Sequence, residues 1–146
     1  MLEFWRAGGS LSLASAEAAK SVEAEGWDGQ MFMDSQSLGA DPYVLMGAWA
    51  LATERLKLSP GVTNPLTRHP VVTAASIAGV QLISGGRAVL GIGRGDSALA
   101  HIGLAPVSLV SFRQALNDLQ RLLRGELTPF ASHGASTSHA PGVESL

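Results

Sequence analysis

The chain has 146 residues, of which 46% are hydrophobic and 15% are charged. This composition suits one folded domain and excludes general disorder. A formal net charge of −2 excludes the positive surface potential with which proteins hold nucleic acid or anionic membranes. Because cysteine is absent, a disulfide scaffold, a thiolate metal site and a cysteine nucleophile are excluded as well. No secretory signal pattern opens the chain and no apolar run reaches the ~18 residues of a membrane span, so we expect a cytoplasmic protein.

Short apolar segments alternate with helical patterns along the chain. The segments predicted as strands are residues 2–6, 30–33, 56–63 and 87–92. The segments predicted as helices are residues 11–25, 41–53, 70–83 and 109–123. Each strand and its helix take about 30 residues, the length of a βα repeat. Strands that are apolar throughout are typical of a parallel sheet covered by helices. We therefore predict an α/β fold of four βα units within residues 1–126.

The helix ends carry recognisable capping residues. Ser10 or Ser12 is expected to cap the first helix, and Asp41 followed by Pro42 the second. His69 stands before Pro70 at the start of the third helix and is interpreted as a cap or a packing residue, not as a catalytic base.

The composition changes after residue 126. Residues 127–146 are rich in Ser, His, Ala, Gly and Pro and have no periodicity, so we predict an unstructured tail. The alternative is that the coding sequence is truncated or shifted in frame at this point.

A glycine-rich turn, Gly91–Asp96, follows the fourth predicted strand. It is not a dinucleotide fingerprint, because the third glycine is missing and Gly95 comes one position early. Backbone N–H groups in such a turn can bind an anion, although many glycine turns are only tight turns. Arg94, at the carboxyl end of a parallel strand, is well placed to hold a phosphate. The alternative for Arg94 is a surface pair with Asp96.

Polar residues also follow the second and third predicted strands, at the edge where α/β proteins bind ligands. The Asp34 carboxylate could shape its loop or contact a ligand. Gly61 permits close approach of the backbone to a planar ligand, or an unusual peptide geometry. Thr63 and Asn64 offer neutral hydrogen-bonding groups suited to ring nitrogens and carbonyls, or simply start a polar loop.

Few groups in the sequence could move protons. No histidines have metal-ligand spacing, and no nucleophile elbow, Ser/His/Asp order or pair of acids is present. Binding groups without proton movers are typical of an enzyme whose cofactor does the chemistry. We identify no catalytic residue.

Eight short motifs resemble, in order and spacing, the N-terminal half of the luciferase-like monooxygenases. That family includes bacterial luciferases, alkane and sulfonate monooxygenases, and F420-dependent reductases such as methylenetetrahydromethanopterin reductase. The motifs are residues 26–28, 34–36, 41–43, 52–58, 61–65, 68–70, 84–87 and 91–95. The resemblance implies the first four units of a (β/α)8 TIM barrel. It also implies a flavin- or F420-dependent oxidoreductase that binds FMN or coenzyme F420 and a small-molecule substrate.

The resemblance assigns roles to individual positions. Gly61–Val62 falls where members carry a non-prolyl cis peptide that supports the flavin ring. Arg94 matches an arginine that helps bind the cofactor phosphate, and Asp34 matches the acidic position after the second strand. Ser35 departs from the pattern, because luciferases and many F420 enzymes have histidine there.

The length also departs from the pattern, since members have eight βα units. We expect a truncated form, marginally stable unless it self-associates, for example as two half-barrels. The alternative function is that of a non-catalytic truncated paralogue, at most a weak flavin-binding or interaction domain.

Overall fold

The computed structural model describes residues 2–8 and 15–126, and all statements below concern these residues. Three parallel strands form one sheet in the order β1-β2-β3. The elements in chain order are β1 (Trp5–Gly8), α1 (Ala16–Ala24), β2 (Gly29–Phe32), α2 (Pro42–Ala52), β3 (Lys57–Pro60), α3 (Pro70–Ile83), α4 (Asp96–Ala100) and α5 (Leu109–Leu123). The predicted α/β class is confirmed, because each strand is followed by a helix and all strand pairs are parallel.

The prediction of a continuous fourth strand at residues 87–92 is wrong. The segment runs beside β3 but forms only two isolated bridges, Leu58 with Ala88 and Thr63 with Ile92. Leu58 exchanges backbone hydrogen bonds with this segment, donating at 3.0 Å and accepting at 2.8 Å. The next donor in the ladder would be the N–H of Pro60, which proline lacks. The ladder therefore stops and resumes only at Thr63.

Side chains cap the helices as their sequences favour. The α2 cap is confirmed: Asp41 Oδ1 accepts from the Tyr43 N–H at 2.8 Å, with Pro42 in the first turn. His69 Nδ1 accepts from the Val71 N–H at 3.3 Å and caps α3, as predicted. The first helix begins later than predicted, because Ser15 is its cap. Ser10 and Ser12, like the tail predicted at 127–146, lie outside the described residues.

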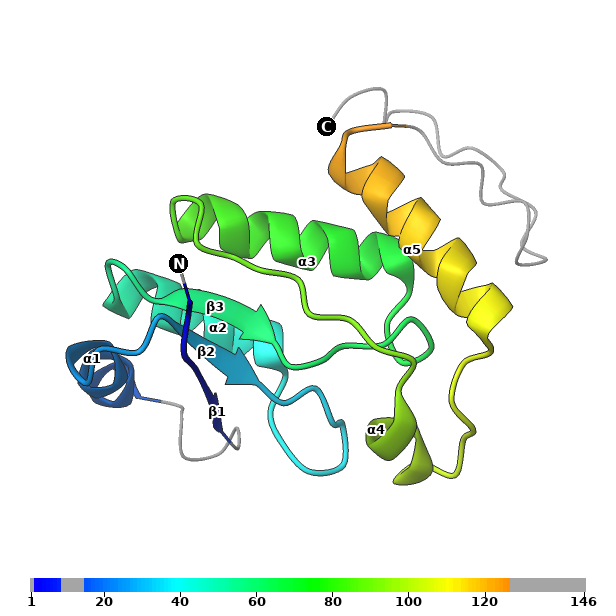
Figure 1. Cartoon of the computed structure of the whole chain (residues 1–146), viewed down its shortest axis with the longest axis horizontal. Helices are drawn as coiled ribbons and strands as arrows, with labels where there is room; N and C mark the ends of the chain where they lie inside the picture. Colours follow the sequence, from blue (N-terminus) through cyan, green and yellow to red (C-terminus); the bar gives the residue numbers. More distant parts are fainter. Residues whose placement is uncertain (1, 9–14, 127–146) are drawn as a thin grey trace.

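The core lies between the sheet and the helices α1, α2 and α3. Trp49 of α2 meets Phe32 of β2 edge-to-face, with ring centroids 5.2 Å apart, and both side chains are fully buried. α5 packs on α3 and buries Ala115 and Leu119. Figure 1 shows α4 and the loops that precede α2 and α3 on the side toward which the strand arrows point. α4 was not predicted. Within the described ranges, no helix combines the length and apolar character that a membrane span requires.

Candidate functional site

Three loops meet at the carboxyl ends of the strands and enclose a pocket of about 240 Å³. Its walls are residues 33–35 with Leu38, residues 61–62, and residues 93–98. The sequence placed these segments at one edge of the sheet, and the structure brings them together. Pockets for drug-sized ligands usually measure ~300–1,000 Å³, so the described residues form one part of such a site.

The first wall carries Asp34, which is almost completely buried. Its Oδ1 accepts from Gln36 Nε2 at 2.7 Å, and its Oδ2 lies 3.7 Å from Arg68 Nε. Next to it, the Ser35 side chain is also buried, and its Oγ has no hydrogen-bond partner among the described residues. Asp34 thus shapes its loop, which is one of the two roles considered from the sequence, and it also lines the pocket.

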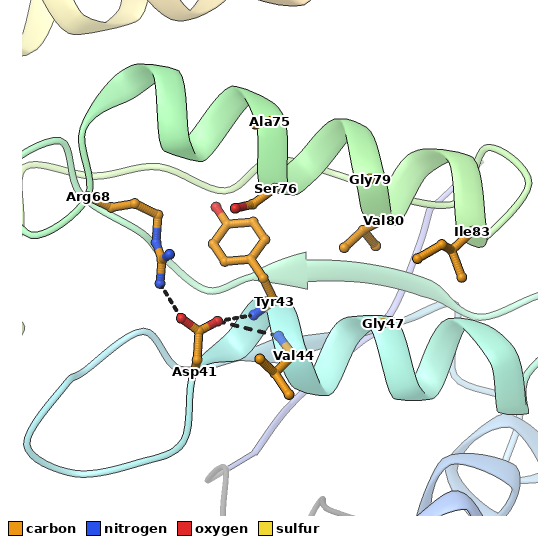
Figure 2. Close-up of a pocket in the computed structure, with 10 residues that line it drawn as sticks. All are labelled: Asp41, Tyr43, Val44, Gly47, Arg68, Ala75, Ser76, Gly79, Val80 and Ile83. Carbon is orange, nitrogen blue, oxygen red and sulfur yellow. Dashed lines mark hydrogen bonds and ion pairs between the residues drawn. The ribbon is translucent and has the colours of Figure 1, made fainter.

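Arg68 joins this wall to the loop after β3. Its Nη2 donates to Asp41 Oδ2 at 2.7 Å, and its guanidinium lies 4.7 Å above the Tyr43 ring (Figure 2). Burial alone would raise the pKa of Asp41, but the hydrogen bond and charge of Arg68 outweigh it and lower that pKa. Burial lowers the pKa of Arg68, and the carboxylates of Asp41 and Asp34 more than restore it. This network was not predicted from the sequence, although Asp41 and Arg68 each stand in one of the motifs that carry the family resemblance.

The second wall is the end of β3. The Gly61–Val62 peptide bond is cis, as the resemblance implies. Val62 is half exposed and lines the pocket. Thr63 and Asn64 do not line the pocket, because both side chains are fully buried. Asn64 Oδ1 accepts from the N–H groups of Leu66 (3.1 Å) and Thr67 (2.9 Å) and thereby shapes the loop.

The glycine turn forms the third wall and packs directly against the second. Thr63 N–H donates to Gly91 O at 3.0 Å, and Gly93 N–H donates to Thr63 O at 2.9 Å. A Cβ added to Gly93 would lie 2.9 Å from Val62 Cγ2, so a larger residue would displace the Val62 side chain. Gly95 has φ +87°, a conformation that favours glycine. The glycines therefore allow the two walls to meet.

Arg94 lines the pocket but is not paired with Asp96. Its Nε donates to the Val107 carbonyl at 2.6 Å, and the Val107 N–H donates back to the Arg94 carbonyl at 3.1 Å. These bonds anchor the stem of the side chain to the segment before α5. The two terminal nitrogens have no partner among the described residues and remain available to a ligand.

A second pocket, of about 360 Å³, lies in the groove between α2 and α3 (Figure 2). Its lining is mostly apolar, and its charged residues, Asp41 and Arg68, already bind each other at one end. Its remaining polar side chains are the hydroxyls of Tyr43 and Ser76. In the described part of the chain, no cluster of His, Cys, Asp or Glu could hold a metal ion.

Residues 10–141 match the family model described as luciferase-like monooxygenase. The 5,10-methylenetetrahydromethanopterin reductase of Archaeoglobus fulgidus is 35% identical over 130 residues, covering 84% of this chain and 39% of that protein. The enzyme of the same name from Methanopyrus kandleri is 54% identical over 59 residues, covering 38% of this chain and 17% of the relative. Limonene 1,2-monooxygenase of Rhodococcus erythropolis is 32% identical over 106 residues, covering 70% and 27%.

Solved structures give the same picture. The coenzyme F420-dependent tetrahydromethanopterin reductase from Methanopyrus kandleri aligns with a TM-score of 0.68 and 25% identity, over 84% of this chain and 39% of that one. The oxygenating constituent of 3,6-diketocamphane monooxygenase from Pseudomonas putida, in complex with FMN, aligns with a TM-score of 0.68 and 23% identity, over 84% and 40%. This chain thus spans about two fifths of the length of these proteins.

Proposed function

This chain belongs to the luciferase-like monooxygenase family, and we propose that it forms the cofactor-binding wall of a flavin- or F420-dependent oxidoreductase. The observation that carries the proposal is the pocket at the strand ends, where Asp34, Gly61, Val62 and Arg94 converge. Two relatives support the choice of cofactor, because one is described as F420-dependent and the other contains FMN.

The residues fit such a cofactor. A phosphate carries negative charge and several acceptor oxygens, and the two terminal nitrogens of Arg94 are free donors. A flat ring can lie against backbone, and the backbone of Gly61 and Gly93 lines the pocket beside Val62. Glycine is needed at both positions because a Cβ would collide with Met31 (2.7 Å) or Val62 (2.9 Å). Ser35 Oγ is a buried hydroxyl that can bond a polar group of the ligand. When bound, FMN or F420 would supply the electron transfer of an oxidoreductase.

We assign each candidate residue a binding or supporting role. Arg94 holds the cofactor phosphate, and Gly61 and Val62 face the ring. Asp34 fixes the loop that presents Ser35. Thr63 and Asn64 support the site from behind, since they join the second wall to the third and shape the loop after β3. These groups bind and orient the cofactor, which reacts with the small-molecule substrate. We assign a proton transfer to none of them.

The test is a fluorescence titration of the full chain with FMN and, separately, with F420. We expect micromolar binding of one of them. Arg94→Ala should weaken it roughly tenfold or more, because a charge-assisted phosphate contact is lost. Arg113→Ala is the matched control, since Arg113 is exposed on α5. If neither cofactor binds, or if both variants bind like the unchanged chain, the proposal is wrong.

We also propose that the chain self-associates through α2 and α3. Residues 42–53 and 70–84 contain no charged side chain, yet Val44, Leu51 and Leu82 are 70%, 80% and 83% exposed. Two uncharged apolar helices that lie side by side can pack on the same face of a second copy without burying a charge.

Sedimentation velocity tests the self-association. We expect a dimer that Leu82→Glu dissociates, whereas Val110→Glu, on the equally exposed Val110 of α5, leaves it intact. A monomer at all concentrations would contradict the proposal.

A further inference from the structure

Arg68 contacts three residues of a loop and helix to which it does not belong. It lies between β3 and α3, whereas its partners Asp34, Asp41 and Tyr43 follow β2. The contacts are the 2.7 Å hydrogen bond to Asp41, the 3.7 Å ion pair with Asp34 and the approach to the Tyr43 ring at 4.7 Å. Only 15% of the Arg68 side chain is exposed. A guanidinium with this many contacts is held in one orientation.

The two loops that Arg68 joins are two walls of the candidate pocket. The pairing of β2 with β3 ends at Phe32 and Pro60, and the Gly61 N–H then donates to the Phe32 carbonyl at 2.7 Å. Asp34 and Ser35 lie beyond this pairing, on the pocket wall. Their position relative to Gly61 and Val62 therefore depends on side-chain contacts, of which the Asp34–Arg68 pair is one.

The two carboxylates in this cluster explain why Arg68 bridges Asp34 and Asp41. Asp34 is a buried carboxylate, with 1% of its side chain exposed, and burial of a charge is costly unless an opposite charge lies near. Asp41 is more exposed and also caps α2, so it holds the far end of the guanidinium to a rigid helix. Arg68 thus connects a pocket-lining carboxylate to the start of α2.

We propose that Arg68 is a positioning residue of the cofactor pocket: through Asp34 it sets where Ser35 and the first wall stand relative to Gly61 and Val62. Arg68 does not line that pocket; it lines a neighbouring pocket of about 230 Å³ that shares Asp34 and Ser35 with it, and it acts on the cofactor pocket through Asp34. The expected effect of Arg68 on cofactor binding rests on the proposed function. The effect of Arg68 on the placement of residues 33–38 can be measured without any cofactor.

The first test is amide hydrogen exchange on the full chain without cofactor. Arg68→Met keeps the aliphatic stem and removes the charge. We expect exchange at residues 33–38 to accelerate by roughly tenfold or more, because the loop loses its tie. Exchange within α5 should be unchanged. Arg87→Lys is the control for general destabilisation, since Arg87 lies at the opposite ends of α2 and α3 and should not accelerate residues 33–38 selectively. Unchanged exchange at 33–38 in Arg68→Met overturns the inference.

The second test is a double-mutant cycle on the affinity for FMN or F420. Arg68→Met and Asp34→Asn should each weaken binding roughly tenfold, and together by clearly less than the product, because they remove the same interaction. Arg68→Lys should recover part of the affinity, since the ammonium can meet one carboxylate but not both. Multiplicative losses, or no loss in Arg68→Met, overturn the coupling. If the unchanged chain binds neither cofactor while the exchange result holds, the proposed function fails and the positioning role stands.

Discussion

Arg87 binds both polar groups of Thr53, donating from Nη1 to its hydroxyl and from Nη2 to its carbonyl, at 2.9 Å each. The remaining donors reach the carbonyls of Ser84, Ala50 and Leu56 at 2.8 Å. All five N–H groups of one guanidinium are thereby used, and they close the end of α2 against β3.

Arg87→Lys should therefore lower the free energy of unfolding by about 2–4 kcal/mol, because lysine cannot form this fork and leaves buried carbonyls without donors. Urea denaturation measures the change. Arg113→Lys, at an exposed position of α5, should have no measurable effect. Equal stability of the two variants would show that the fork contributes nothing.

We expect Glu23 to make a pH-dependent contribution to stability. Its carboxylate accepts from the backbone N–H groups of Glu54, Arg55 and Leu56 at 2.7–3.2 Å. Burial opposes the charge, but these bonds outweigh it and lower the Glu23 pKa. A carboxylate with a lowered pKa stabilises the fold at pH values above its pKa in the unfolded chain, which is about 4.3. This contribution disappears as the pH falls through the pKa of the folded state.

Glu23→Gln should thus be less stable than the unchanged chain at neutral pH, and the difference should shrink in acid. Thermal denaturation at pH 7 and below pH 4 checks both points. Glu54→Gln, which removes a neighbouring exposed carboxylate, is the control. A constant difference across this range would contradict the assignment.

Tyr43 can be observed alone, because it is the one tyrosine of the chain. Burial raises its pKa to about 12. Absorbance of the phenolate should therefore appear about two pH units later in the folded protein than in denaturant, where the pKa is about 10. Since the unfolded chain loses the proton first, stability should fall as pH rises from about 10 to 12. Coincident titration curves would show that the ring is not buried.

Two glycine-to-alanine changes should have opposite signs. At Gly79, inside α3, an added Cβ meets nothing within 4 Å, so Gly79→Ala should stabilise the fold by about 0.5–1 kcal/mol through helix propensity. At Gly91 an added Cβ would collide with the Pro60 carbonyl and crowd Val62 Cγ1 at 3.3 Å. Gly91→Ala should cost about 2 kcal/mol or more. Chemical denaturation of both variants side by side is the measurement, and a stable Gly91→Ala would contradict the close packing of the two walls.

Local chemistry in the sequence was enough for most of the fold. The α2 and α3 starts follow from Asp41-Pro42 and His69-Pro70, because a cap and a proline act within one turn. The extent of the fourth strand could not be read from residues 87–92, which are apolar enough for a strand. The ladder is interrupted by Pro60 of the neighbouring strand β3, which has no backbone N–H to donate. The cause therefore lies in β3 and not in residues 87–92.

The candidate site divides in the same way. The strand-end positions of Asp34, Gly61 and Arg94 follow from residue order, since parallel strands all end at one edge of the sheet. Their partners do not. Arg94 binds Val107 and not Asp96, and Asp34 binds Arg68 from another loop, 34 positions later in the chain. Sequence periodicity reports which way a residue faces within its own element. Only packing in three dimensions decides which distant residue it meets there, because that depends on how the loops between elements close.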